Sequence, residues 1–439
     1  MDPKPVRIYT VEDSPRLRYI AEIILGDILG LSWEVTSDKR KLRKCPVINY
    51  SSENIAGSFR ILPHPLLFEK GVFPREINIS KWSGLPVFFC VPGEADLPFD
   101  IFAASFFLIS RYEEYTEHEA DEHGRFRASS SLAFKNGFLG IPVVDLWVKE
   151  MSMVFLRKFS NMAFKRNEFR SMLTIDTDQA FAYRGKNILR SLGGVMNDIR
   201  NNNHKLSERY RTITQGRKDP FDVFEYMSEN IAKNQVDARF FFPVGDYSKY
   251  DKNPSWKNGE YRKLITGIAV RYKTGLHPSY NAAGNLIMLR AEKERLSSIV
   301  EKDVTCSRYH FIKISMPQSY RDLWNEGITE DYSMGYPDEV GFRAGIARPY
   351  CFYDVTEDKP TGLKVYPFQV MDGTMFQYKG LGPDVAKDLI LKMINETRKV
   401  GGLFISIWHN TSLLDDDQWR CWREVFEFML KNQAYDNLS

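Results

Sequence analysis

The sequence has few of the features that mark secreted or membrane-spanning proteins. Its five cysteines are an odd number at irregular spacings with no CxxC pair, which argues against a disulfide framework and a cysteine-rich zinc site. No run of about 18 uncharged apolar residues could span a membrane, and the first residues, MDPKPVRIYTVEDSP, lack the apolar core of a signal peptide. We therefore expect a cytoplasmic protein without a membrane span.

An excess of charge of one sign is also missing. The 60 Lys and Arg residues nearly balance the 57 Asp and Glu residues, which leaves a formal net charge of +3. A strongly basic surface is the usual sign of nucleic-acid binding, so the composition indicates no nucleic-acid partner. The sequence does contain 43% hydrophobic and 14% aromatic residues over 439 positions, which is ample for two packed cores.

Two patterns divide the chain. Residues 1–165 combine apolar positions at helical spacing, in 15–31, with short strand-like runs, which indicates a smaller mixed α/β domain. Residues 166–439 alternate amphipathic stretches of helix length with seven strand-like runs: SMLTID, ARFFFP, TGLH, RYHFIKI, DYSMGY, LKVYPFQVMD and LFISIWH. This alternation predicts a parallel sheet, either a TIM-like barrel or a doubly wound sheet.

A Lys- and Arg-rich insertion at about residues 182–218 follows the first of these strands. It is long for a connection, and could be a lid, an anion-binding or dimer contact, or a solvated helix without special function.

Most of the predicted strands end in residues that can do chemistry: Asp176, Asp178, His277, His310, Asp372 and His409. The carboxyl ends of barrel strands converge on one face, so residues far apart in sequence can meet there. The simpler alternative is that each strand merely enters a polar loop.

Residue types at these ends suit metal-assisted hydrolysis. Asp176 and Asp178 are two positions apart on an extended segment and would point to the same side, so that one could bind a metal while the other takes a proton from water. His277, followed by a proline, is a candidate ligand for zinc or a similar metal. His409 follows a buried strand and could protonate a leaving amine.

Further candidates lie next to these positions. RYHFIKI alternates as a strand, which would place Arg308 and His310 on one face. Arg343 and Arg348 lie in the loop-like segment GFRAGIARPYCFYD, where they could orient carboxylates or bind an anionic substrate. The alternative is surface arginines beside core aromatics.

Aromatic residues complete the predicted substrate contacts: Tyr350 in that segment, Tyr280 after His277, and Trp408 before His409. In residues 1–165, His118 and His123 lie among acidic residues; this pattern favours a polar loop over a metal site.

The chain resembles the polysaccharide deacetylases of the NodB-homology or carbohydrate esterase family 4 group, specifically the bacterial proteins that carry an N-terminal DUF7033 domain. The segments that carry the resemblance span both halves of the chain: FDIFAASFFLISRYEEY, HGRFRASSSLA, GFLGIPVVDLW, DPFDVFEYM, GLHPSYN, DYSMGYPDEVGFRAG, MDGTMFQY and IWHN.

This resemblance implies a distorted (β/α)7 barrel after the DUF7033 domain, with the active site at the carboxyl ends of the strands. TIDTD matches the family's first motif, which implies Asp176 as catalytic base and Asp178 as metal ligand. His277 matches a metal histidine, His409 the catalytic acid, and Arg308 an arginine that tunes the base.

The sequence departs from the family at one position. A second metal histidine is usual four residues after the first, where this chain has Asn281. We propose His310 as its replacement; an Asn281 carbonyl, an extra water or a lost metal are the alternatives. The family's fourth motif is also unclear, with Asp331, Asp338 and Asp372 as candidates.

The resemblance implies a metal-dependent hydrolase that removes an acetyl group from an N-acetylated sugar of a polysaccharide or its precursor. Zn²⁺ is the expected cofactor, with Co²⁺ or Ni²⁺ as alternatives. Peripheral contact with a lipid-linked glycan is compatible with the sequence, which does not indicate whether the protein is a homo-oligomer. The alternative functions are a glycosyltransferase that uses the DTD segment to bind a metal and a diphosphate, and a catalytically silent carbohydrate-binding homologue.

Overall fold

The computed structural model describes residues 5–185, 203–414 and 419–434. Its N-terminal part contains a parallel four-stranded sheet in the order β2-β1-β3-β4. These strands are β1 (Val6–Tyr9), β2 (Trp33–Thr36), β3 (Val47–Tyr50) and β4 (Phe59–Ile61), and a separate antiparallel hairpin joins β5 (Ser80–Trp82) to β6 (Leu85–Val87).

Helices cover this sheet. α1 (Pro15–Ala21) starts at Ser14, whose side chain accepts a hydrogen bond from the Leu17 amide, and continues into the π-helical segment η1 (Glu22–Ile28). Every residue of α2 (Ile101–Ile109) is buried, as expected for a helix that is apolar on all sides. The remaining helices are α3 (Leu132–Lys135) and α4 (Val143–Lys158), with short turns η2 (Lys39–Leu42), η3 (Pro65–Leu67), η4 (Tyr112–Tyr115) and η5 (Ala128–Ser130).

The C-terminal part is built on a nine-stranded sheet in the order β12-β13-β11-β10-β9-β8-β7-β15-β14. All neighbours pair in parallel except β12 and β13. The strands are β7 (Arg170–Asp176), β8 (Asp237–Phe242), β9 (Lys273–Leu276), β10 (Cys306–Ser307), β11 (Glu330–Asp331), β12 (Tyr350–Asp354), β13 (Lys359–Val365), β14 (Val370–Met371) and β15 (Leu403–His409).

The predicted distorted (β/α)7 barrel is not confirmed. From β7 to β11 the strands follow one another across the sheet in chain order, as in a barrel, and one small apolar cluster unites Phe241 on β8, Tyr332 after β11 and Met371 on β14. Among the described residues, however, no pairing joins β13 to β14, so the sheet stays open at that point. The C-terminal part is therefore a mixed α/β fold with a curled, mainly parallel sheet.

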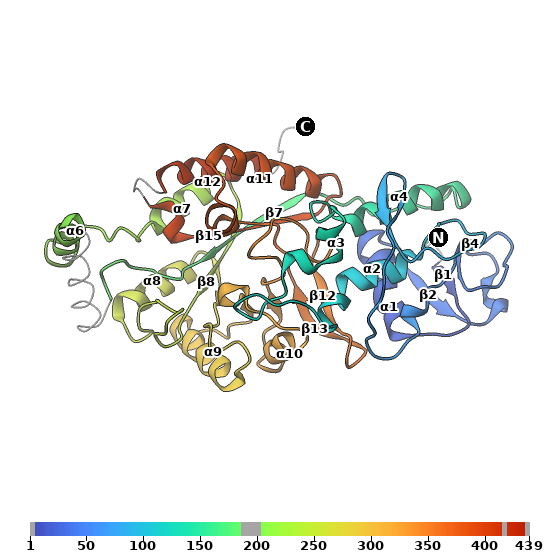
Figure 1. Cartoon of the computed structure of the whole chain (residues 1–439), viewed down its shortest axis with the longest axis horizontal. Helices are drawn as coiled ribbons and strands as arrows, with labels where there is room; N and C mark the ends of the chain where they lie inside the picture. Colours follow the sequence, from blue (N-terminus) through green and yellow to red (C-terminus); the bar gives the residue numbers. More distant parts are fainter. Residues whose placement is uncertain (1–4, 186–202, 415–418, 435–439) are drawn as a thin grey trace.

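Helices flank the outside of the nine-stranded sheet (Figure 1). α11 and α12 pack together and α11 lies against β15, while α8 and α9 pack against β9 and α10 against β13. Their bounds are α7 (Phe224–Lys233), α8 (Gly259–Ala269), α9 (Leu286–Val300), α10 (Gln318–Asn325), α11 (Pro383–Arg398) and α12 (Arg420–Gln433), with the turns η6 (His310–Ile312), η7 (Thr374–Tyr378) and η8 (Asn410–Leu413). Among the described residues, no helix has the length and apolar character needed to cross a bilayer.

The predicted insertion at 182–218 is only partly described. Residues 186–202 lie outside the described residues, and α6 (Asn203–Thr214) follows them. In Figure 1, α6 lies at the opposite end of the molecule from the four-stranded sheet.

Candidate active site

Strand register brings the first set of predicted residues together. β15 pairs with β7 so that His409 lies opposite Asp176, and β7 pairs with β8 so that Asp176 lies opposite Phe241. Asp178 follows two residues later, and His277 directly follows β9. These residues lie at the carboxyl ends of parallel strands, where the sequence predicted them.

A pocket of about 200 Å³ opens at this edge of the sheet. Its lining includes Asp176, Asp178, His277, His310 and His409 together with Arg125, Gln179, Tyr309, Phe311, Ile312, Pro337, Met371, Gly373, Gln377, Tyr378, Thr411 and Ser412. A larger, mainly apolar pocket of about 670 Å³ lies between α1 and β13, but it contains none of the predicted site residues. We therefore take the smaller pocket as the candidate active site.

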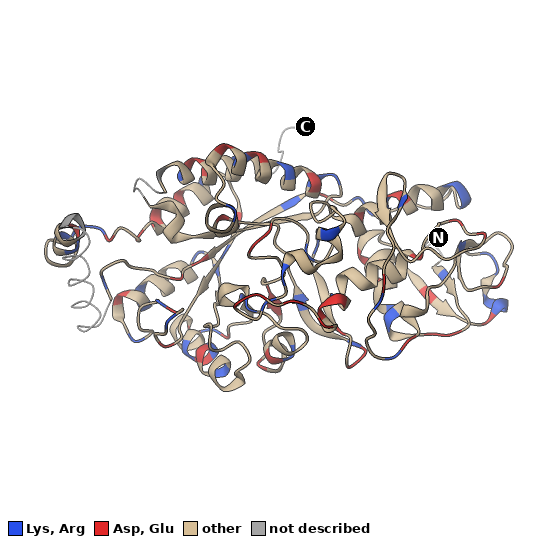
Figure 2. Ribbon diagram, viewed as in Figure 1, with Lys and Arg blue, Asp and Glu red and all other residues tan. Residues whose placement is uncertain are grey.

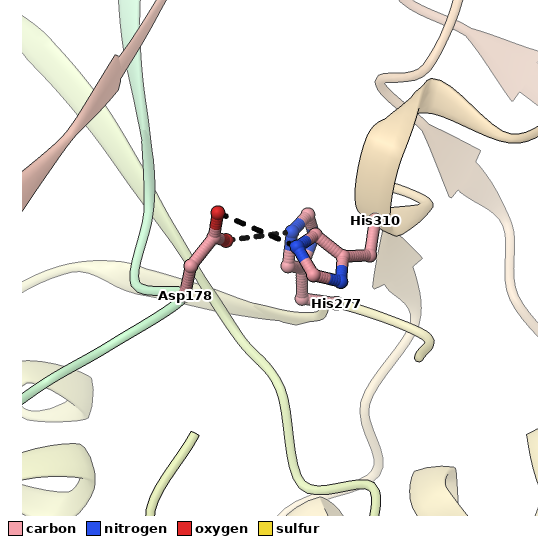
Figure 3. Close-up of side chains that lie close together, drawn as sticks. All are labelled: Asp178, His277 and His310. Carbon is pink, nitrogen blue, oxygen red and sulfur yellow. Dashed lines mark ion pairs between the residues drawn. The ribbon is translucent and has the colours of Figure 1, made fainter. Parts of the chain in front are cut away.

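Asp178, His277 and His310 form a compact group (Figure 3). One potential ligand atom from each lies within 4.8 Å of the others, and no other group of three or more such residues occurs in the part of the chain that the structure describes. The Nε2 atoms of His277 and His310 lie 3.1 and 3.4 Å from the two carboxylate oxygens of Asp178. His310 thus occupies the third position, whereas Asn281 is exposed.

Hydrogen bonds fix the orientation of both imidazoles. His277 Nδ1 lies 2.6 Å from the Arg308 carbonyl oxygen, and His310 Nδ1 lies 2.9 Å from a carboxylate oxygen of Asp251. Because a carbonyl and an ionised carboxylate only accept hydrogen bonds, Nδ1 is the donor in each ring. In the neutral tautomer each Nε2 therefore presents a lone pair toward Asp178, as in metal sites supported by outer hydrogen-bonding groups.

This donor set fits a divalent metal. His277 Nε2 and Asp178 Oδ1 are both buried, and neither makes a hydrogen bond of acceptable geometry although they face each other. Burial opposes ionisation of Asp178, but in the metal-free protein the protonated rings of His310 and His409 outweigh it and hold its pKa well below the usual range; a bound cation would take the place of the His310 proton. A carboxylate with two imidazoles is a common ligand set for zinc and related ions.

Asp176 faces a buried arginine. Its Oδ1 lies 3.5 Å from Nη1 of Arg308, whose Nη2 donates to Thr174 Oγ1 at 2.7 Å. The Arg308 guanidinium lies over the rings of Phe241 and Phe368 and has no exposed surface. Arg308 therefore contacts Asp176, the predicted base, from the protein interior and does not line the pocket.

His409 is held by Asp372. Its Nδ1 lies 2.7 Å from one oxygen of Asp372, and its backbone N–H donates to the other at 2.8 Å. Burial lowers the pKa of His409, but the carboxylates of Asp372 and Asp178 outweigh burial and raise it to about 10. Nε2 faces the pocket, 3.7 Å from Asp178.

Of the fourth-motif candidates, Asp372 hydrogen-bonds the predicted acid, His409. Asp331 instead accepts hydrogen bonds from the hydroxyls of Ser307 and Ser333. The sequence did not indicate a role for Asp251, which lies in the loop after β8. Besides orienting His310, this carboxylate accepts hydrogen bonds from the Ser248 hydroxyl and the Tyr280 amide. Nothing in its local sequence, KYDKN, distinguishes it from an ordinary loop aspartate.

The predicted strand RYHFIKI is wrong. β10 ends at Ser307, and His310 begins a short turn in which Phe311 and Ile312 have φ angles of +59° and +52°. Arg308 and His310 both reach the site, but a turn rather than strand alternation places them there.

Two predicted substrate-binding arginines lie elsewhere. Arg343 has 1% exposure and pairs with Glu114 through Nε and Nη2 at 2.9 and 2.7 Å. Arg348 pairs with the buried Asp145 at 2.6 Å. Each guanidinium is occupied by a carboxylate of the N-terminal part, and neither arginine is among the residues that line the pocket.

The predicted aromatic contacts also need correction. Tyr350 is buried in β12 with 2% exposure, because its segment forms a hairpin with β13 rather than a loop. Trp408 is fully buried against Trp422 and Phe426, since successive strand residues point to opposite faces and His409 takes the pocket side. Tyr280 does not line the pocket, but its ring packs against the pocket residue Phe311.

Comparisons with solved structures find several similar folds at low identity. A Mycobacterium smegmatis protein described as a polysaccharide deacetylase matches with 15% identity and a TM-score of 0.40, over 61% of this chain and 85% of that one. The Bacillus cereus polysaccharide deacetylase Bc1974 matches with 12% identity and a TM-score of 0.30, over 61% and 87%. Puue allantoinase matches with 10% identity and a TM-score of 0.38, over 61% and 86%. These values are too low to assign an activity.

Sequence comparisons identify the N-terminal part. No curated protein sequence matches the chain significantly. Residues 6–160 match DUF7033, which is described as a family of unknown function. The chain therefore carries the DUF7033 domain that its motifs predicted, and the solved structures similar to it include polysaccharide deacetylases.

Proposed function

We propose that the protein is a divalent-metal-dependent hydrolase that removes the acetyl group from an N-acetylated sugar. The observation that carries the proposal is the convergence of Asp178, His277 and His310 in one pocket with an acid, Asp176, and a carboxylate-supported imidazole, His409. The low-identity likeness to polysaccharide deacetylases agrees with it but is not needed for it.

In this mechanism, Asp178, His277 and His310 would hold the cation, with Zn²⁺ as the first choice and Co²⁺ or Ni²⁺ as alternatives. When bound, such a cation polarises a carbonyl and lowers the pKa of water. Asp176 takes the proton of the attacking water, and Arg308, whose Nη1 lies 3.5 Å from Oδ1 of Asp176, orients this carboxylate. His409, protonated because of Asp372, donates a proton to the leaving amine as acetate departs.

The decisive experiment separates metal binding from chemistry. Asp176→Asn should retain bound metal but lose roughly 10²–10⁴-fold in kcat, because it lacks only the base. His277→Ala should lose both metal and turnover. Metal content by elemental analysis and acetate release from N-acetylated mono- and oligosaccharides measure the two effects. Normal acetate release by Asp176→Asn would refute the assignment of the base.

A wild-type protein that binds metal yet releases no acetate from any of these sugars would refute the deacetylase activity itself. If nucleoside diphosphate were released from a nucleotide sugar instead, the glycosyltransferase alternative would replace it.

A further inference from the structure

One loop of the DUF7033 domain reaches into the candidate active site. Arg125 is the single residue of the 6–160 match among those that line the pocket in the described part of the chain. Its side chain is only 4% exposed. In Figure 1 the chain on either side of this loop, between α2 and α3, lies in the middle of the molecule, between the two sheets.

The loop has a fixed conformation. The carboxylate of Asp121 accepts hydrogen bonds from the backbone N–H groups of His123 and Arg125, both at 2.9 Å, and from Nε of Arg125 at 2.6 Å. Gly124 has a φ of +75°, a conformation that glycine adopts without strain. The Arg125 side chain therefore starts from a rigid turn, and Asp121 balances its charge.

The Arg125 guanidinium connects the two sides of the pocket. Nη1 donates to the Phe311 carbonyl oxygen at 2.6 Å, and Nη2 donates to the Tyr378 hydroxyl at 3.3 Å. Phe311 directly follows His310 on the metal side. Tyr378 ends η7, the turn that begins two residues after Asp372 on the acid side.

The turn that Arg125 holds is a strained one. Phe311 and Ile312 both have positive φ angles, which are uncommon for residues with a side chain and rarest for β-branched ones. Such conformations persist only where the surroundings determine them, and they concentrate at functional sites. Here the surroundings include the bond from Arg125 and the ring of His123, whose centroid lies 5.1 Å from that of Phe311.

We propose that the DUF7033 domain completes the active site, with Arg125 as a positioning residue that holds the turn presenting His310 to the metal. The proposal rests on the metal-binding role of His310 in the proposed function. In this chain the domain would therefore line one side of the pocket and fix the geometry of one metal ligand, His310. His123, predicted to belong to a polar loop, assists by packing on the same turn.

Co²⁺ binding to the full-length protein tests this proposal without using activity. Arg125→Met should weaken Co²⁺ affinity about 10-fold or more, in the range found for outer-shell partners of metal ligands, and alter the visible Co²⁺ spectrum. Arg125→Lys should show a smaller loss, because a single ammonium retains the charge beside Asp121 but not all three contacts. Arg127→Met is the matched control, since Arg127 is exposed on the same loop, its side chain donates to the Ala120 carbonyl oxygen, and it is not among the residues that line the pocket.

Wild-type affinity and spectrum in Arg125→Met would overturn the positioning role. If that variant does not fold, the Lys variant decides, and equality with wild type overturns the proposal in the same way. If the wild-type protein bound no Co²⁺, or if His277→Ala bound Co²⁺ as tightly as wild type, both proposals would be refuted. Co²⁺ binding without acetate release would refute only the deacetylase activity.

Discussion

At the scale of single residues, Asp178 is the centre of the site. Three imidazole Nε2 atoms face its carboxylate, from His277, His310 and His409 at 3.1, 3.4 and 3.7 Å. Only two of these rings belong to the proposed metal set. The third, His409, differs because its Nδ1 partner, Asp372, also binds its backbone N–H, which anchors ring and strand end together.

Asp372→Asn should shift the pH dependence of the reaction. The Asp372 carboxylate is the largest contribution that raises the pKa of His409 against the effect of burial. Without that charge, His409 loses its proton at lower pH, so the basic limb of the kcat/KM profile should move to lower pH, with a fall in activity at neutral pH. The profile from pH 5 to 10 measures the shift.

Asp331→Asn is the control for that experiment, because Asp331 is equally buried but accepts hydrogen bonds from Ser307 and Ser333 rather than from His409. A basic limb at the same pH in wild type and Asp372→Asn would remove His409 as the catalytic acid.

At the scale of secondary-structure elements, the fully buried strands were predictable and the turns were not. β7 and β15 are mostly apolar and almost wholly buried, and their parallel register brings Asp176 beside His409. The three predicted metal ligands lie close together, but the strand expected to carry His310 is a turn. Period-2 alternation cannot distinguish a strand from a turn that backbone strain and distant contacts stabilise.

The sequence also did not indicate the residues that support the site. Asp251 and Arg125 lie in loops, where no periodicity marks a functional side chain, and each acts on a residue far away in sequence. Conversely, Arg343 and Tyr350 looked suited to substrate binding because of their neighbours, whereas the fold uses them in its interior. Residue type therefore indicates a role in the site only where the end of a strand also fixes the position of the side chain.

Helix α9 supports the loop after His277 through a buried carboxyl. Glu292 accepts hydrogen bonds from the amide and hydroxyl of Ser279 at 2.8 and 2.5 Å. Burial raises the pKa of Glu292 to about 7, against an ordinary value of 4.5. The folded protein therefore keeps a proton on this group that the unfolded chain releases.

The stability of the metal-free protein should depend on this group between pH 4.5 and 7. The contribution of Glu292 is fully present below pH 4.5 and is lost as the pH rises toward 7, by up to about 3 kcal/mol. Glu292→Gln cannot ionise, so its unfolding free energy relative to wild type should increase over this range. Urea unfolding at several pH values measures the difference.

Glu294→Gln is the matched control on the same helix, because Glu294 is exposed. It should follow the wild-type pH dependence. If the curves for wild type and Glu292→Gln ran parallel from pH 4.5 to 7, the buried carboxyl would not be protonated in the folded state.

At the scale of the whole molecule, the DUF7033 domain and the curled sheet share one interior. A single cluster of buried apolar side chains runs from the four-stranded sheet to the C-terminal helices. Within it lies a charged network: Glu114 accepts hydrogen bonds from Arg343 and Arg111, and Arg111 also contacts Glu113 and the Arg343 carbonyl oxygen. The blue and red segments in the middle of Figure 2 show that charged residues also occur between the two sheets.

Glu114→Gln should destabilise the entire chain, not only the DUF7033 domain. Burial opposes ionisation of Glu114, but the two guanidinium groups lower its pKa to about 2, so at neutral pH it is the anion between them. Removing one member of a buried ionic group leaves an uncompensated charge, which costs roughly 3–5 kcal/mol. Because the interior is shared, circular dichroism and tryptophan fluorescence should report the same, lowered urea midpoint.

Arg290→Gln gives the comparison, since Arg290 pairs with Glu326 at the surface and is 59% exposed. Because solvent screens the exposed guanidinium of Arg290, loss of this pair should lower the urea midpoint much less than Glu114→Gln does. Two separate transitions in Glu114→Gln, with the fluorescence of the C-terminal tryptophans unchanged, would mean that the sheet folds without the DUF7033 domain. In that case the DUF7033 domain, with Arg125, would pack against a pocket that had already folded. A single transition would mean that the pocket and the domain fold together.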